Sequence, residues 1–181
     1  MNRFDAKAAT WEDKPSRAER ARVTAETIAA RIPLQRTWSV LDVGSGTGLL
    51  SRMLADRVGT ILLVDTSPGM TEVASEMIAA RGDHQLSAVC LESVLCHLEP
   101  GGYLAFADVA AEDGSFHDDP DEEVHHHGFE PDHLAAMAAA AGFVEVSVEE
   151  IHQLTKERDG RDSSYGLLLL TGRVPVTVTT P

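Results

Sequence analysis

The sequence predicts an α/β protein built on a doubly wound, mostly parallel sheet. Short apolar segments alternate with amphipathic ones along most of the chain, which is typical of consecutive βαβ units. Three glycines stand within five residues, at positions 44, 46 and 48, directly after the first apolar segment. Two further apolar segments near the C-terminus predict an antiparallel hairpin at the edge of the sheet.

The first predicted elements are a helix over residues 16–32 and a strand over residues 38–43. Ser16 and Glu19 have the spacing of a capping box, and the apolar residues that follow recur with the helical period. The strand runs into the glycines, and a second helix is expected over residues 48–57.

The central part of the chain continues the alternation. Residues 60–65 form a second buried strand, and the Thr-Ser-Pro sequence at 66–68 supplies a cap and a first-turn proline for the next helix. Residues 86–90 are a third and weaker strand, and residues 103–109 are another.

The C-terminal part begins with a polar loop, residues 111–129, that is rich in His and Asp. Pro131 opens an alanine-rich helix. The last two strands, residues 144–151 and 165–174, are joined through a charged loop at 156–162 and form the predicted hairpin.

The composition argues against a nucleic-acid partner and is compatible with a small-molecule ligand. The 181 residues include 29 acidic and 15 basic side chains, for a net charge of −14, and such a surface repels a nucleic-acid backbone. A cationic ligand is compatible with this charge, although solubility alone accounts for it. We find no signal peptide or membrane span, and Cys90 and Cys96 form no metal or disulfide pattern, so a cytoplasmic protein is expected.

The segment VLDVGSGTGLL predicts a tight strand-to-helix turn that lies against a ligand. Gly44 allows the bend, while Gly46 and Gly48 leave room where a Cβ would collide with the ligand. Asp65 ends the next strand, where a carboxylate can accept both hydroxyl protons of a ribose. Together these features predict a cofactor that contains adenosine.

Three details bear on which cofactor this is. Leu49 stands where the dinucleotide pattern G-x-G-x-x-G has its third glycine, and the chain has no G-x-x-x-x-G-K-[ST] phosphate loop. Asp42 lies two residues before Gly44, and an anion there suits an ammonium or sulfonium better than a pyrophosphate. The turn therefore favours a cationic cofactor without phosphates.

These motifs resemble those of the class I S-adenosylmethionine-dependent methyltransferases, which have a Rossmann-like fold. LDVGSGTG, LLVDTSPGM and LEPGGYLAFADV follow one another in the family's order, and the resemblance covers most of the chain. EDGSFH, HHHGF and AAAAGF are similar to a small-molecule branch near the quinone-biosynthesis methyltransferases. The resemblance implies S-adenosyl-L-methionine as cofactor and methyl transfer to a small-molecule acceptor.

The resemblance also implies a set of cofactor-binding residues. Asp65 would hold the ribose hydroxyls, and Thr66 and Met70 would flank the adenine. The methionine and ribose part would be lined by Asp42, Gly44, Ser45, Gly46 and Gly48. The resemblance assigns no catalytic residue and requires no metal.

We expect one domain over residues 1–181. Its parts are an N-terminal lid helix (1–36), a cofactor-binding core (37–110), an acidic and His-rich loop (111–129), and a helix with the terminal hairpin (130–181).

The chain departs from the family at one place. The family has a strand–helix unit of about 30 residues before the LxPGG turn, whereas only 11 residues separate the third strand from Gly102 here. Either the strand at 86–90 moves inward to fill the vacancy, or the sheet is one strand short. In both cases the adenine wall changes, and Glu92 is the nearest remaining acid.

Five histidines lie in or near the polar loop, beside several aspartates. A metal site, a general base and a plain polar lid are all compatible with this pattern, because adjacent loop histidines lack the fixed spacing of ligands on a helix. If one of them is the base, His117 and His127 are the candidates. The histidines are His117, His125, His126, His127 and His133.

Two segments, 5–32 and 111–129, are expected to shape the acceptor pocket. Trp11 is either an apolar lid residue or a packing anchor. Arg17 and Arg20 are interpreted as a solvated helix face rather than as a clamp for a substrate carboxylate.

Two rival functions stay open at this point. The missing unit is compatible with a module that binds S-adenosylmethionine without catalysing transfer. A nicotinamide dehydrogenase is the second rival, and both Leu49 and Asp42 argue against it.

Overall fold

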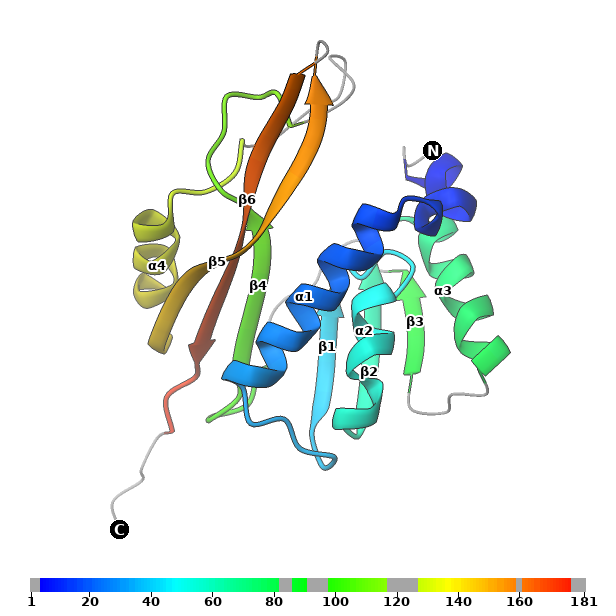
Figure 1. The fold of residues 1–181 in the computed structure, drawn as a ribbon. Helices are drawn as coiled ribbons and strands as arrows, with labels where there is room; N and C mark the ends of the chain where they lie inside the picture. The colour runs from blue at the N-terminus through cyan, green and yellow to red at the C-terminus, as the bar shows by residue number, and fades with distance from the viewer. Residues whose placement is uncertain (1–3, 82–85, 91–97, 117–126, 159–160, 177–181) are drawn as a thin grey trace. The chain divides into compact units, whose positions relative to one another are not determined.

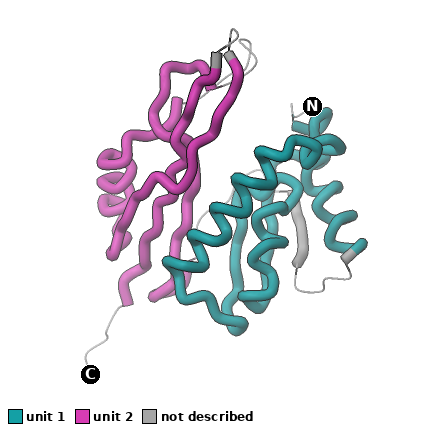
Figure 2. Tube along the Cα trace, viewed as in Figure 1, with its two compact units in different colours: residues 1–96 teal, residues 97–181 magenta. Residues whose placement is uncertain are grey.

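A computed structural model describes residues 4–81, 86–90, 98–116, 127–158 and 161–176. The chain divides into two compact units, residues 1–96 and 97–181, which Figure 2 shows in different colours. Each unit is described by itself. Their division falls in the short junction after the third strand.

Unit 1 contains a parallel three-stranded sheet (Figure 1). Its strands are β1 (Ser39–Val43), β2 (Thr60–Asp65) and β3 (Leu86–Cys90), in the order β1-β2-β3. The register pairs Leu41 with Leu62 and Asp65 with Cys90. All three strands were predicted within one residue of these bounds, and the predicted α/β fold class is confirmed.

Helices pack against this sheet. They are η1 (Asp5–Asp13), α1 (Pro15–Arg31), α2 (Leu49–Leu54), η2 (Ala55–Arg57) and α3 (Pro68–Arg81). α1 contacts α2, whereas α3 contacts β2, β3 and η1. Ile61 and Leu63 of β2 are buried in the core beneath them. The N-terminal segment expected as one lid helix is thus a 3₁₀ helix followed by a separate α-helix.

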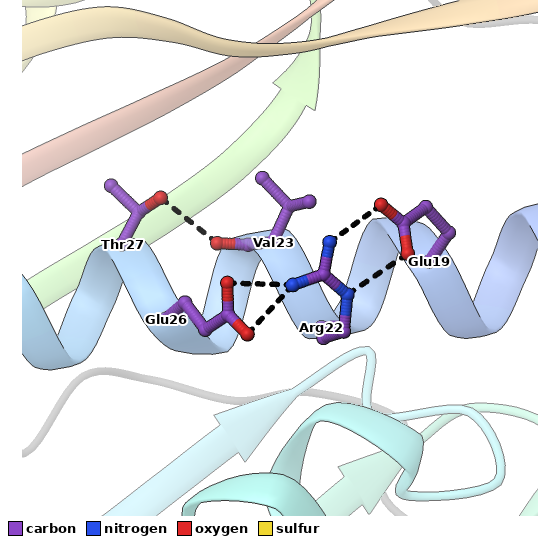
Figure 3. A network of polar contacts seen from close by, with 5 residues as sticks. All are labelled: Glu19, Arg22, Val23, Glu26 and Thr27. Carbon is purple, nitrogen blue, oxygen red and sulfur yellow. Dashed lines mark hydrogen bonds and ion pairs between the residues drawn. The ribbon is translucent and has the colours of Figure 1, made fainter.

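The predicted capping box at the start of α1 does not form. The N-cap residue is Lys14, Pro15 occupies the first turn, and no side chain caps the helix. Glu19 instead accepts from Arg22, which also pairs with Glu26 (Figure 3). These hydrogen bonds raise the pKa of the exposed Arg22 guanidinium above its usual range. Proline has no backbone N–H, so the first turn has one donor fewer that needs a cap.

The described residues of unit 2 form an antiparallel three-stranded sheet and one helix. Its elements are β4 (Tyr103–Val109), α4 (Pro131–Ala140), β5 (Val144–Arg158) and β6 (Arg161–Arg173), and the strand order is β4-β6-β5. Leu134 and Ala138 of α4 pack on Leu168 and Leu170 of β6. The predicted C-terminal hairpin is therefore present, with β6 paired to β4.

The hairpin is longer than predicted. The prediction of a charged loop at 156–162 is wrong. Pairing continues through Glu157 with Asp162 and Arg158 with Arg161. Alternating charged residues are compatible with a strand whose two faces reach solvent. The sequence holds Asp-Gly at 159–160, a dipeptide favoured in two-residue hairpin turns, and this signal favours strands longer than those predicted.

The strand at 86–90 does not move inward. Among the described residues β3 stays beside β2, so β1 is an edge of its sheet, and β4 is an edge of the other. Leu41 and Val43 of β1 are exposed, as is Leu62 of β2. These side chains share one sheet face, because Leu41 pairs with Leu62 and Val43 lies two residues after Leu41. The alternative in which the strand at 86–90 moves inward is therefore wrong for the strands that the structure describes.

The described helices include none with both the length and the apolar character that crossing a membrane requires.

Candidate cofactor site

The glycine turn after β1 is held against the end of β2. Gly44 and Ser45 donate their backbone N–H groups to the carbonyl of Val64, at 2.8 and 3.1 Å. Gly44, Gly46 and Gly48 all have positive φ, at 71°, 55° and 76°. The left-handed conformation is costly for residues with a Cβ, so the backbone path itself requires glycine at these positions.

The space around these glycines differs from one to the next. A Cβ at Gly44 would meet no atom within 4 Å, and one at Gly46 would meet only the indole nitrogen of Trp11, at 3.9 Å. A Cβ at Gly48 would overlap Cδ2 of Leu63, which is fully buried. The turn is therefore open at Gly44, whereas Gly48 is needed for packing against β2. The predicted cofactor contact of Gly48 stays a prediction.

Asp65 joins the turn to the end of β2. Its Oδ2 accepts the N–H of Gly46 at 2.8 Å, and its Oδ1 accepts the N–H of Ser67 at 2.8 Å. The bend and the carboxylate thus lie on the same side of the sheet. An ionised carboxylate offers about four lone-pair sites, so each oxygen can accept one more hydrogen bond. The ribose contact predicted for Asp65 remains compatible with these bonds.

Asp42 is a second carboxylate beneath the turn. The hydroxyl of Ser51 in α2 donates to its Oδ2 at 2.5 Å. Burial raises the pKa of Asp42, the Ser51 hydrogen bond opposes that rise, and the charge of Asp65 adds to it. Two mutually repelling carboxylates next to an open turn favour a cation between or beside them.

A test of fit for the predicted cofactor comes from Ser45. Its Oγ is buried and has no hydrogen-bond partner among the described residues. An unsatisfied buried hydroxyl costs free energy that a ligand group can recover. Together with Asp42, Asp65 and the open face of Gly44, this hydroxyl fits a ligand that carries an ammonium group and ribose hydroxyls.

The two residues expected beside the adenine differ in exposure. Thr66 is exposed directly after Asp65. Met70 is 2% exposed, so its side chain belongs to the core and presents almost no surface to a ligand. The adenine contacts of both residues stay predictions. Glu92, the acid nearest the missing unit, lies outside the described residues.

The N-terminal 3₁₀ helix η1 reaches the glycine turn. Glu12 Oε1 accepts the hydroxyl of Thr47 at 2.7 Å and the guanidinium of Arg52 at 2.6 Å. Arg52 also donates to the carbonyl of Thr47, at 2.6 Å. Since Trp11 lies beside Gly46, η1 packs directly against the turn. The role of residues 5–32 as a lid over the acceptor stays a prediction. The sequence did not single out Glu12 or Arg52, which lie 40 residues apart.

Asp5 caps α3 from the same segment. Its Oδ1 accepts the hydroxyl of Ser67 at 2.5 Å and the N–H of Gly69 at 3.0 Å. Ser67 is the predicted cap, and its Oγ accepts the N–H of Met70 at 3.2 Å. A Cβ at Gly69 would lie 2.8 Å from the Cα of Asp5, so glycine permits this close approach. An aspartate at a helix N-terminus also complements the helix dipole.

Two contacts hold the Trp11 side chain: a cation–π contact with Arg17 and an aromatic contact with Phe4. The guanidinium of Arg17 lies 3.6 Å from the indole centroid and donates to the Trp11 carbonyl at 2.5 Å. Phe4 meets the indole edge to face, at 5.9 Å. Arg17 is therefore half-buried against Trp11, and its interpretation as part of a solvated face is wrong.

The loop histidines are only partly described. His117, His125 and His126 lie outside the described residues. His127 lies near Glu112 in unit 2, and His133 is exposed on α4. Within the described part of the chain, no three His, Cys, Asp or Glu side chains are placed to hold a metal ion.

The comparisons with known proteins agree with this geometry. Residues 40–101, which include the glycine turn and Asp65, match the family model described as "Methyltransferase domain". The matched residues lie within the part of the chain that the sequence predicts to bind the cofactor. A search of curated proteins gives no match.

Solved structures share the fold. A protein crystallised with the Haloferax volcanii methyltransferase activator Trm112 has 21% identity and a TM-score of 0.71, with 97% of this chain and 99% of that one covered. DhpI in complex with S-adenosylhomocysteine has 19% identity and a TM-score of 0.66, over 95% and 93%. The [4+2]-cyclase SpnF has 19% identity and a TM-score of 0.65, over 86% and 82%.

The comparisons thus agree with the class predicted from the sequence: residues 40–101 match a methyltransferase domain model, and the structures that share the fold include one solved with S-adenosylhomocysteine. The closer likeness to the quinone-biosynthesis branch is not specifically supported by these comparisons.

Proposed function

We propose that this protein transfers a methyl group from S-adenosyl-L-methionine to a small-molecule acceptor. The observation that carries the proposal is the 2.8 Å hydrogen bond from Gly46 N–H to Asp65 Oδ2, which brings the open turn together with the carboxylate that we propose as the ribose ligand. Asp42 and the unsatisfied Ser45 hydroxyl complete a site suited to a cationic nucleoside.

The residues of the chain would act by binding and alignment. When bound, the cofactor supplies a methyl group already activated by its sulfonium. Asp42 and Asp65 hold its charged and hydroxyl groups, and η1 covers the turn through Trp11 and Glu12 and excludes water from that side. Holding two reactants in line can account for about 7–11 kcal/mol of barrier reduction, so no metal is required.

Calorimetry with S-adenosylmethionine, followed by an assay for S-adenosylhomocysteine release, tests the proposal. We expect binding, and release that depends on an acceptor. Failure to bind the cofactor would refute the proposed function. Because SpnF is a cyclase with a similar fold, acceptor turnover must be measured and not inferred from binding.

A second candidate is a module that binds the cofactor but does not transfer the methyl group. It is favoured by one observation, the three-stranded sheet of unit 1 with β1 at its edge. Binding without S-adenosylhomocysteine release over a broad acceptor panel would support it.

We also propose that residues 1–181 act as one functional domain and that the protein is cytoplasmic, as expected from the sequence. Limited proteolysis tests the first point: cleavage near the junction of the two units should abolish acceptor-dependent release if both units are needed.

A further inference from the structure

The indole N–H of Trp11 faces the glycine turn of unit 1 and has no acceptor among the described residues. A Cβ at Gly46 would meet Trp11 Nε1 at 3.9 Å, and no other atom beyond its chain neighbours lies within 4 Å of that position. The contacts that Trp11 does make are with Arg17 and with the ring of Phe4. An indole N–H can only donate, so an acceptor that enters the space over Gly46 meets a ready donor.

Contacts at both ends of η1 hold this donor in place. At the start of η1, Asp5 accepts the hydroxyl of Ser67 at 2.5 Å. At the other end Glu12, the residue after Trp11, accepts the guanidinium of Arg52 at 2.6 Å. A donor that is already positioned loses little conformational freedom when a ligand binds. All of these residues belong to unit 1, so the arrangement does not depend on unit 2.

The charges near the turn differ between its two sides. Asp42 and Asp65 place two carboxylates at the turn, and such a pair favours a cation. On the side of η1, the Arg17 guanidinium lies 3.6 Å from the centroid of the Trp11 indole. A positive charge stacked on the ring favours an anion as the acceptor of the indole N–H. The turn therefore offers one place for a cation and another, at Trp11, for an anion.

An α-amino acid group carries both of these charges on one carbon atom. The methionyl end of S-adenosylmethionine is such a group, with an ammonium and a carboxylate. A ligand with the ammonium alone would leave the indole N–H of Trp11 without an acceptor, and the free energy of that hydrogen bond would be lost to binding. The charge pattern of the turn thus fits an amino acid better than a simple amine.

We propose that the indole N–H of Trp11 donates to the carboxylate at the methionyl end of S-adenosylmethionine, and that the stacked Arg17 guanidinium contributes its charge. This inference rests on the proposed function and adds to it a binding residue from η1. Trp11 is then a polar ligand of the cofactor, which neither an apolar lid residue nor a packing anchor would be. The site selects ligands that keep the carboxylate.

The first test compares two ligands that differ only at this carboxylate. S-Adenosylmethionine and its decarboxylated analogue share the adenosine, the sulfonium and the ammonium. Trp11→Phe keeps an aromatic ring beside Arg17 but has no N–H. By calorimetry we expect Trp11→Phe to weaken binding of S-adenosylmethionine by about 10- to 100-fold, the loss of one hydrogen bond to a charged group. Binding of the decarboxylated analogue should stay within about twofold of that of the wild type.

Trp38→Phe is the matched control for this comparison. Trp38 is the other of the two tryptophans in the sequence, and it precedes β1 at the end of the strand away from the glycine turn. Its replacement should change neither affinity. Equal weakening of both ligands in Trp11→Phe would show a packing role alone and overturn the proposal, as would an unchanged affinity for S-adenosylmethionine.

Arg17→Met tests the contribution of the charge. The variant keeps a long side chain against the indole and removes the cation. We expect S-adenosylmethionine to bind more weakly and the decarboxylated analogue to bind as it does to the wild type. An effect of the same size on both ligands overturns the contribution of Arg17.

The second test needs no change at Trp11. The two indole N–H groups give two resonances in a ¹H–¹⁵N correlation spectrum, and Trp38→Phe assigns them by removing one. We expect the Trp11 proton to move downfield when S-adenosylmethionine is added, because a hydrogen bond to a carboxylate deshields it. It should move much less with the decarboxylated analogue. A Trp11 resonance that responds equally to both ligands overturns the proposal.

The outcomes distinguish this proposal from the proposed function. A wild type that binds S-adenosylmethionine and the decarboxylated analogue equally well overturns the carboxylate contact, while the methyltransferase function stands. A wild type that binds neither ligand refutes the proposed function, and the contact with it. Both tests measure binding, so their results apply equally to a protein that binds the cofactor without transferring its methyl group.

Discussion

The backbone N–H of Gly46 and the Oδ2 of Asp65 lie 2.8 Å apart, although 19 residues separate them in the sequence. The bond closes the glycine turn of β1 onto the end of β2, and the second oxygen of Asp65 holds the N–H of Ser67. One carboxylate therefore fixes the turn and, with its remaining lone pairs, can bind a ribose.

Replacement of Asp65 by alanine should weaken S-adenosylmethionine binding by about a hundredfold or more. Each hydrogen bond to a charged group contributes about 1.5–3 kcal/mol, and a ribose would lose two. The free energy of unfolding should also fall, by about 1–3 kcal/mol, because two backbone N–H groups lose their acceptor. Calorimetry and urea denaturation measure the two effects.

Asp56→Ala supplies the control, since Asp56 is an exposed carboxylate in η2. It should leave both quantities unchanged. Equal cofactor affinity in Asp65→Ala and wild type would remove the ribose role from Asp65 and leave it a structural residue.

Gly48 and Gly44 should respond differently to alanine. Both have positive φ, so each substitution costs about 1–2 kcal/mol from the backbone conformation. Only at Gly48 does the new methyl group overlap Leu63, and overpacking adds about 1–3 kcal/mol. Urea denaturation should therefore show the larger loss of unfolding free energy for Gly48→Ala.

The Leu63→Ala background checks the cause of that difference. Removing the Leu63 side chain makes room for the methyl group, so the extra penalty of Gly48→Ala over Gly44→Ala should largely disappear. A penalty that persists in this background would show that the overlap with Leu63 is not its source.

The features predicted from the sequence are those set by neighbouring residues. Apolar runs located β1, β2 and β3, and Ser67-Pro68 marked the start of α3. The order of glycine turn and Asp65 predicted the candidate cofactor site. Asp5 and Glu12 were missed, because a single carboxylate in a polar segment does not indicate which distant donors it will meet. Their partners, Ser67 and Arg52, lie 62 and 40 residues away.

Two errors have local physical causes. The capping box was expected from Ser16 and Glu19, but proline at the first turn leaves one donor fewer to cap, and Arg22 offers Glu19 a charged partner. The hairpin was cut short because its charged residues were interpreted as a loop. The two strands pair up to Arg158 and Arg161, so the charged side chains do not prevent strand pairing there.

The contact between Glu12 and Arg52 should control how firmly η1 is held on the glycine turn. The Arg52 side chain is 9% exposed and that of Glu12 is 27% exposed, so the pair is shielded from solvent. Glu12→Gln should lower the unfolding free energy by about 1–3 kcal/mol and speed amide hydrogen exchange in residues 5–13. A double-mutant cycle with Arg52→Met isolates the pairwise energy.

Glu19→Gln is the matched control for this pair, because Glu19 also bonds to an arginine but in an exposed pair on α1. Exchange in residues 5–13 should not change in that variant. If Glu12→Gln likewise leaves the exchange unchanged, the lid is held by Trp11 and Asp5 instead.

Asp42 should make the unfolding free energy of the apoprotein depend on pH. Burial raises its pKa in the folded state above the unfolded value of 3.8, so the folded protein binds the proton more tightly than the unfolded chain. The contribution of Asp42 to stability is therefore largest below the unfolded pKa and is lost as pH rises through the folded pKa. Asp42→Asn should raise the unfolding free energy of the apoprotein at pH 7, as urea denaturation can show.

Cofactor binding should depend on Asp42 in the opposite sense. A bound ammonium or sulfonium favours the ionised carboxylate, so S-adenosylmethionine affinity should fall as pH decreases through the pKa of Asp42 in the folded protein. Asp42→Asn should bind the cofactor weakly, with a flatter pH dependence, while being the more stable apoprotein. Calorimetry from pH 4 to pH 8 tests this. Ser51→Ala is a second variant, in which loss of the hydrogen bond from Ser51 raises the pKa of Asp42 further. The fall in cofactor affinity should then begin at a higher pH than in the wild type. Parallel pH profiles for wild type and Asp42→Asn would mean that the cofactor's cation is held elsewhere.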